Sequence, residues 1–192
     1  MKYLSTAARR VIAVIAGASV AGLIVTTAAF AAPSSGTVRA STAAIPRCTA
    51  ADLGVWLAVA QANGAAGTIY YPLEFTNVSG HTCFLHGYPG VSAIDRNGNQ
   101  LGSPAGWTSP AAAPTVVLAP GATAHTILQY SDAEVSTAPG CDPVYTAVVL
   151  RIYPPDEHGA TIAMFSLEAC SHKGPVYMRV VPILPGIGRI QA

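Results

Sequence analysis

The segment from Phe75 to Val91, FTNVSGHTCFLHGYPGV, constrains the fold of this 192-residue chain more than any other. It reads as a strand that ends at Asn77, a Ser-Gly turn, a second strand through Cys83, and a corner built from glycine and proline. One cysteine lies before this segment and two lie after it. Together these features predict a disulfide-stapled β-sandwich outside the cytoplasm.

The chain has four cysteines, and in an exported protein four cysteines more often form two disulfides than a metal site. Three connectivities are possible. We favour Cys48–Cys83 with Cys141–Cys170, which close loops of 35 and 29 residue steps (83 − 48 and 170 − 141). In the chain-entropy description each bridge would stabilise the fold by roughly 3–4 kcal/mol.

The first 31 residues have the organisation of a signal peptide. Lys2, Arg9 and Arg10 form a positive region, residues 11–30 contain no charged side chain, and the small-x-small sequence that ends at Ala31 suits signal peptidase. We expect cleavage after Ala31 and a secreted product. The alternative is an uncleaved anchor, because about 20 apolar residues can span a bilayer, and only then would the protein contact a membrane.

Removing this segment changes the charge balance of the chain. Three of the ten Lys and Arg residues are lost and none of the nine Asp and Glu, which leaves seven against nine and a formal charge of −2. A weakly acidic body without a basic cluster does not attract phosphate backbones. We therefore expect no nucleic-acid partner.

The rest of the chain is patterned as short strands. Val55, Leu57 and Val59 alternate on one face of a first strand, and Ile69, Tyr71, Leu73 and Phe75 on one face of a second, with Tyr70 and Glu74 opposite. Asp-Arg-Asn-Gly at 95–98 predicts a hairpin, because Asn-Gly suits a type I′ turn. No stretch keeps a helical period. We expect a flexible linker over 32–47, an all-β domain of about seven to nine strands over 48–183, and a C-terminal tail over 184–192.

Several motifs resemble a known family, the secreted actinobacterial domain-of-unknown-function family numbered 4232. They are CTAADL (48–53), LEFTNVSG (73–80), TCFLHGYPG (82–90), the 95–98 hairpin, LAPG (118–121), CDP (141–143), LRIYPP (150–155) and Cys170-Ser171. The resemblance implies an immunoglobulin-like antiparallel β-sandwich at the cell surface or in the medium, with the cysteines paired as favoured above. It brings no catalytic residues and no known ligand.

Two aromatic residues are candidates for a binding surface. Trp107 lies in a Gly-Trp-Thr-Ser-Pro loop, where packing between strands does not ensure burial, and Tyr70 lies opposite the expected core face of its strand. Exposed aromatic side chains can stack on sugars or anchor a protein partner. The alternatives are that Trp107 folds back as a cap on the sandwich end and that Tyr70 only packs across strands.

A metal site is the alternative function. Cys170-Ser-His172 followed by Met178 has the ligand order of exported copper β-sandwiches, and such a site requires a free thiolate. His81 and His86 flank a cysteine and form a second cluster with the residue types that zinc prefers. A disulfide at either cysteine would remove the thiolate.

Catalytic motifs are lacking in the sequence. It contains neither Gly-x-Ser-x-Gly nor Ser-x-x-Lys, and the carboxylates of Glu74 and Glu168 belong to separate expected strands. We therefore expect a non-enzymatic binding or structural module without a cofactor. Its expected partner is a component of the cell envelope, an extracellular protein or a glycan.

Overall fold

The computed structural model describes residues 44–108, 112–132, 139, 141 and 144–189. The chain separates into a unit over 1–41 and a unit over 42–192, and all of the described residues belong to the second. The expected signal peptide, its cleavage point at Ala31 and most of the expected linker therefore lie outside the described residues. Within the described ranges, no helix has the length and apolar character needed to cross a membrane.

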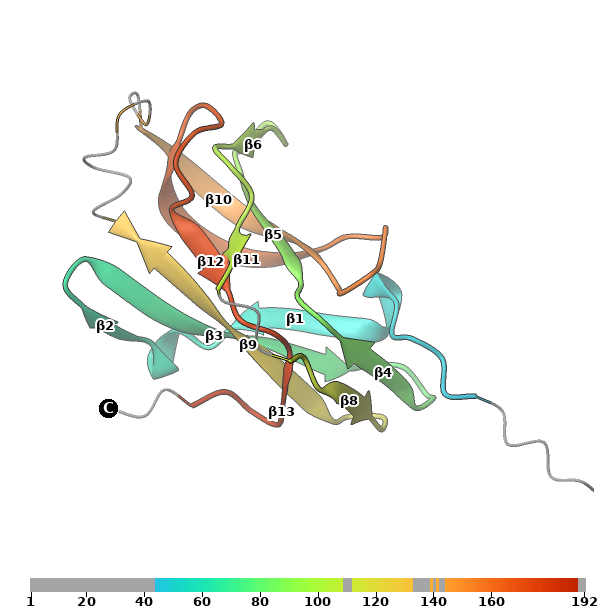
Figure 1. Cartoon of the computed structure of the whole chain (residues 1–192). Helices are drawn as coiled ribbons and strands as arrows, with labels where there is room; N and C mark the ends of the chain where they lie inside the picture. Colours follow the sequence, from blue (N-terminus) through green and yellow to red (C-terminus); the bar gives the residue numbers. More distant parts are fainter. Residues whose placement is uncertain (1–43, 109–111, 133–138, 140, 142–143, 190–192) are drawn as a thin grey trace, which may run out of the picture. The chain divides into compact units, whose positions relative to one another are not determined.

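The described part of the chain is all-β, as the sequence predicts (Figure 1). It contains thirteen strands and two 3₁₀ helices; five strands have two or three residues, and the eight longer ones agree with the expected seven to nine. The elements are η1 (Ala50–Asp52), β1 (Leu53–Leu57), η2 (Val59–Gln61), β2 (Asn63–Ala65), β3 (Thr68–Asn77), β4 (Cys83–His86), β5 (Gly90–Ile94), β6 (Gln100–Leu101), β7 (Gly106–Trp107), β8 (Thr115–Leu118), β9 (Thr123–Ser131), β10 (Val144–Tyr153), β11 (Thr161–Cys170), β12 (Met178–Val180) and β13 (Leu184–Pro185).

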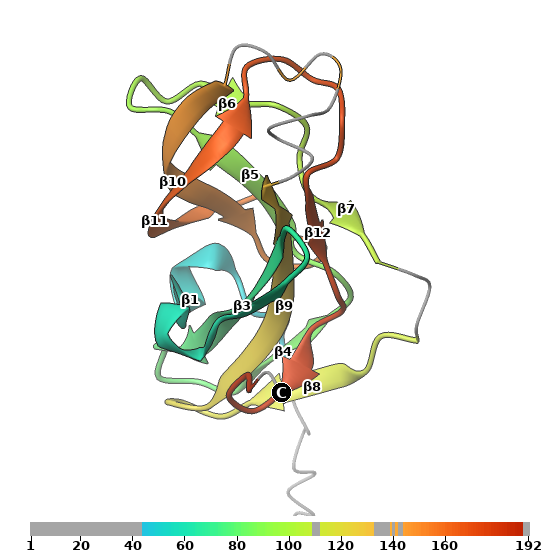
Figure 2. The same ribbon diagram turned by 90° about the vertical axis from the view of Figure 1, so that its left-hand side faces the viewer.

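The strands form three sheets (Figure 2). The large sheet has the order β1-β3-β9-β12-β7, with β2 added beside β3 and β13 beside β9. A second sheet has the order β11-β10-β5-β6, and β4 pairs with β8 in a third. All of these pairings are antiparallel except that between β12 and β7. The immunoglobulin-like topology that the family resemblance implies stays a prediction.

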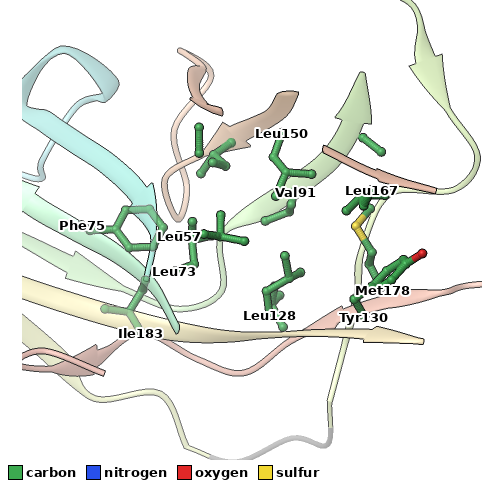
Figure 3. Close-up of a cluster of buried hydrophobic side chains, with 14 of the residues drawn as sticks. Leu57, Leu73, Phe75, Val91, Leu128, Tyr130, Leu150, Leu167, Met178 and Ile183 are labelled. Atoms are coloured by element: carbon green, nitrogen blue, oxygen red, sulfur yellow. The ribbon is translucent and has the colours of Figure 1, made fainter. Parts of the chain in front are cut away.

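The two larger sheets share one hydrophobic core (Figure 3). Alternate residues of β9 are buried along its whole length, as expected for a strand with one face against a core. Leu73, Phe75 and Leu128 enter the core from the large sheet, and Val91 and Leu150 enter it from the second sheet. Burial of these apolar side chains is the main force that holds the sheets together.

Both expected disulfides are present. Cys48 is bonded to Cys83 and Cys141 to Cys170, all four residues are buried, and none of the described cysteines is free. The first bridge fixes the incoming chain beside β4, where Cys48 also donates a backbone hydrogen bond to Phe84 (2.9 Å). The expectation of a disulfide-stapled β-domain is confirmed.

Two local expectations were wrong. Val59 was expected in the first strand, on the same face as Val55 and Leu57, but it begins η2 and is 53% exposed, because β1 already ends at Leu57. The 95–98 hairpin does form between β5 and β6, but its turn is not type I′. Of its residues, Gly98 has a positive φ (+85°) whereas Asn97 does not, and a type I′ turn needs both. Asp95 caps the loop instead, accepting the backbone N–H groups of Asn97 and Asn99 (both 2.8 Å).

Candidate functional site

Trp107 is the most exposed aromatic side chain of the described residues. It ends β7, which pairs in parallel with β12 so that Trp107 lies opposite Val180. Its exposed fraction is 68%, against 45% for Trp56, the other tryptophan of the chain. Trp107 is therefore not folded back into a buried cap.

One face of the Trp107 indole rests on Tyr88. The two ring centroids are 4.9 Å apart, and the ring planes differ by 17°, which is a stacked arrangement. Tyr88 is half-buried and follows Gly87, whose carbonyl accepts the backbone N–H of Ile183 (2.9 Å). The corner that the sequence predicts at 87–90 thus carries the ring that supports Trp107.

The backbone after Trp107 is also held in place. The N–H group of Thr108 donates to the Val180 carbonyl (3.0 Å), and the Thr108 hydroxyl donates to the same oxygen (3.2 Å). Strand pairing and the two hydrogen bonds of Thr108 thus hold the backbone of Trp107, and the Tyr88 ring supports one face of its indole. We call Trp107 and Tyr88 the aromatic platform.

Tyr70 does not belong to this platform. It lies in a row of paired residues that crosses the large sheet: Asn63, Tyr70, Gln129, Arg179 and Gly106. This row is on the outer face, the side of the large sheet opposite the core, whereas Trp107 pairs with the fully buried Val180 in the next row. Since successive residues of a strand point to opposite faces, the two candidates do not converge. Tyr70 is half-buried by its neighbours.

The residues of the metal alternative are dispersed. Cys170 is in a disulfide and so offers no thiolate, Met178 is fully buried and His172 is exposed. His81 lies 3.8 Å from an Asp52 carboxylate oxygen. No group of three or more His, Cys, Asp or Glu side chains in the described ranges is arranged to hold a metal ion. His86 is also exposed, and its Nδ1 is 3.3 Å from the hydroxyl of a neighbouring threonine on β8.

Sequence reasoning missed the most deeply buried carboxylate of the described residues. Glu74 was expected on the solvent side of β3, but it is 1% exposed, because residues 184–189, which we call the C-terminal strap, lie over the outer face there. Its Oε1 accepts the backbone N–H of Gly188 (2.9 Å). Burial raises the pKa of Glu74 above its ordinary value, while the Gly188 hydrogen bond and His125 oppose that shift.

No sequence pattern near Glu74 predicts that the strap buries it. The alternation in β3 marks one core face, yet Pro72, Leu73, Glu74 and Phe75 are all buried in succession. Such a run is typical of a strand covered on both faces. The only local signal is the Gly-Ile-Gly sequence at 186–188, whose partner lies more than one hundred residues earlier in the chain.

Comparison with known families gives one match. The family described as "Domain of unknown function (DUF4232)" matches residues 48–181. No curated protein and no solved structure matches the chain. The match covers the large sheet up to β12, both disulfides and the aromatic platform, and it ends before the C-terminal strap.

Proposed function

The chain belongs to the DUF4232 family of domains of unknown function, and from that premise we propose that it is an extracytoplasmic, non-enzymatic module that binds a ligand through the aromatic platform. The signal-peptide pattern of the first 31 residues and the two buried disulfides support export, since disulfides persist in oxidising compartments. On this proposal the sheets are a scaffold, and recognition takes place at the loops and short strands that carry Trp107 and Tyr88.

The positions of the carboxylates favour binding over catalysis. A glycosidase needs two carboxyl groups that face each other across a cleft. Glu74 is buried beneath the C-terminal strap on the large sheet, and Glu168 is exposed on β11 of the second sheet. Each carboxylate thus lies in a different sheet and a different environment.

One observation carries the proposal: Trp107 is about two-thirds exposed although its backbone is hydrogen-bonded to β12 and one face of its indole is stacked on Tyr88. Holding a side chain in its bound conformation reduces the entropy that is lost on binding. A rigid, exposed indole is therefore an efficient contact for a ligand, and exposed tryptophans are frequent among the residues that dominate binding energies.

The surroundings of Trp107 favour a sugar ring over a protein surface. The core of a protein interface is a cluster of apolar neighbours, whereas Trp107 is the sole exposed large apolar side chain of β7 and β12 in the described structure. A single flat indole can cover the apolar C–H face of one sugar ring.

The test is a binding comparison between three proteins: the wild type, Trp107→Ala and Trp56→Ala. Each is titrated with a panel of purified cell-wall polysaccharides and their oligosaccharide fragments, and binding is measured by calorimetry. We expect at least one glycan to bind the wild type and Trp56→Ala equally and Trp107→Ala about tenfold or more weakly, because truncation of a dominant aromatic contact costs about 2 kcal/mol or more.

Three outcomes would contradict the proposal. Glycan binding that Trp107→Ala leaves unchanged would remove the platform from the ligand site. If a protein binds through Trp107 and no glycan does, the platform is still the binding site, but the ligand is a protein and not a glycan. A catalytic turnover abolished by one side-chain substitution would overturn the non-enzymatic assignment itself.

A further inference from the structure

The C-terminal strap behaves as a peptide bound to the outer face of the large sheet. It begins as β13, which pairs with β9 so that Leu184 is opposite His125 (Figure 1). It then continues over β3 and β9, where Gly186 donates its backbone N–H to the Thr123 carbonyl (3.0 Å) and Gly188 donates to Glu74. The strap therefore adds a short strand to the sheet and then follows its surface.

Two side chains of the sheet contact the main chain of the strap. Glu74 accepts the Gly188 N–H (2.9 Å), and the Nδ1 atom of His125 is 2.8 Å from the Gly186 carbonyl oxygen. Glu74 and His125 are opposite each other in the register of β3 and β9, so they form one site. Both contacts are to backbone atoms of the strap, which bends at 186–187. The site therefore recognises the main chain of the strap whatever most of its side chains are.

One position of the strap has a strict size requirement. A Cβ atom on Gly188 would lie 2.7 Å from the Pro72 Cβ and 2.8 Å from the His125 Cδ2, which is closer than carbon atoms approach without a shift. By contrast, the Ile187 side chain is 65% exposed and is not needed for the fit. The bound sequence must therefore have glycine at 188, and it accepts other residues at 187.

One carboxylate oxygen of the site lacks a hydrogen bond while the strap is bound. The Oε2 atom of Glu74 is buried and has no hydrogen-bond partner among the described residues. Burying a carboxylate oxygen without a partner costs free energy, and opening the strap would return that oxygen to water. This cost lowers the free energy that is needed to open the strap locally.

We propose that the outer face around Glu74 and His125 is a peptide-binding site, which the chain's own C-terminal strap fills and which the same segment of a second copy of this chain can occupy. The intramolecular strap competes at an effective concentration on the order of millimolar, so it dominates in dilute solution. Exchange of an identical segment between two copies needs no new contacts. This site is separate from the aromatic platform, and the proposal does not depend on the glycan ligand.

The test uses the full chain with Gly188→Ala, in which the new Cβ displaces the strap from the site. A fluorescent peptide with the sequence of residues 184–192, LPGIGRIQA, is titrated against this variant and followed by anisotropy. Ile187→Ala is the matched control, because it shortens an exposed side chain and leaves the strap bound. We expect the peptide to bind Gly188→Ala about tenfold or more tightly than it binds the wild type or Ile187→Ala, whose sites are occupied.

A second peptide, LPGIARIQA, has alanine at the position of Gly188 and tests whether the site is the one described. We expect it to bind Gly188→Ala about tenfold or more weakly than LPGIGRIQA, since its Cβ meets Pro72 and His125. Trp56 lies opposite Glu74 in the register of β1 and β3, so its fluorescence reports occupation of the same face. Equal affinity for both peptides, or no binding of either, would overturn the proposal.

The proposal remains testable if Gly188→Ala does not fold. The wild-type chain is then titrated with LPGIGRIQA to several times the effective concentration of the strap, about tens of millimolar, while the Gly188 amide is followed by NMR. We expect that signal to move to the position of an unbound peptide, and LPGIARIQA to have no effect. A Gly188 signal that neither peptide moves would show that the strap is a fixed part of the fold.

Discussion

Removal of either disulfide should destabilise the domain by nearly the same amount. The two bridges close loops of 35 and 29 residues. The chain-entropy relation gives ~3.8 kcal/mol for the first loop and ~3.6 kcal/mol for the second at 25 °C, a difference of only about 0.2 kcal/mol. All four cysteines are buried, so replacement by alanine avoids leaving a hydroxyl without a hydrogen bond inside the core.

The measurement is urea unfolding of two double variants, Cys48→Ala/Cys83→Ala and Cys141→Ala/Cys170→Ala. Each should lose about 4 kcal/mol of unfolding free energy, and each should show a larger denaturant slope, because an uncrosslinked unfolded chain exposes more surface. The quadruple variant should lose about 7–8 kcal/mol, which is comparable to the whole stability of a typical domain of about 5–15 kcal/mol. Losses below 1 kcal/mol, or two losses that differ by several kcal/mol, would refute the entropic reasoning.

Three further predictions concern single side chains. A double-mutant cycle on Trp107 and Tyr88 should give a coupling of about 0.5–1.5 kcal/mol in unfolding free energy, the value for stacked rings; a coupling of zero would contradict the stacked platform. The unfolded chain loses the Glu74 proton near the ordinary pKa of 4.5, whereas the folded chain keeps it to a higher pH, because its pKa is raised. The free energy of unfolding should therefore fall as pH rises from the ordinary pKa through the raised one. Unfolding titrations at a series of pH values should show this decrease in the wild type and not in Glu74→Gln. Tyr177→Phe removes a buried hydroxyl that donates to a backbone carbonyl (3.0 Å) and should cost about 1–3 kcal/mol in urea unfolding, whereas Tyr145→Phe, at a half-exposed position, should cost almost nothing.

The local features of the fold could be predicted from the sequence because they depend on neighbouring residues. Period-two alternation placed Leu73 and Phe75 in the core, and both are fully buried. The strand was expected to end at Asn77 before a Ser-Gly turn, and β3 does end there, with the Asn77 Oδ1 accepting both the backbone N–H (2.9 Å) and the hydroxyl (2.7 Å) of Ser79. The favoured cysteine pairing was also right, although the residues alone left three possibilities.

The long-range features could not be predicted, since nothing in a strand pattern says what will cover its outer face. Glu74 reads as a solvent-facing residue, and only the return of the chain at Gly188, 114 residues later, buries it. The support of Trp107 by Tyr88 likewise joins the end of β7 to the corner at 87–90, and their proximity depends on how the sheets pack. The sequence indicated Trp107 as a candidate, but its support by Tyr88 and the site under the strap became clear only from the tertiary structure.

NMR of the indole N–H groups can show whether Trp107 contacts a glycan. The chain has two tryptophans, so a ¹⁵N-labelled sample gives two indole signals, which the Trp56→Phe variant assigns. During titration with the glycan that binds best in the calorimetric panel, we predict that the Trp107 signal shifts in proportion to occupancy while the Trp56 signal stays in place. Glycan binding that leaves the Trp107 signal unmoved would show that the ligand binds away from the aromatic platform.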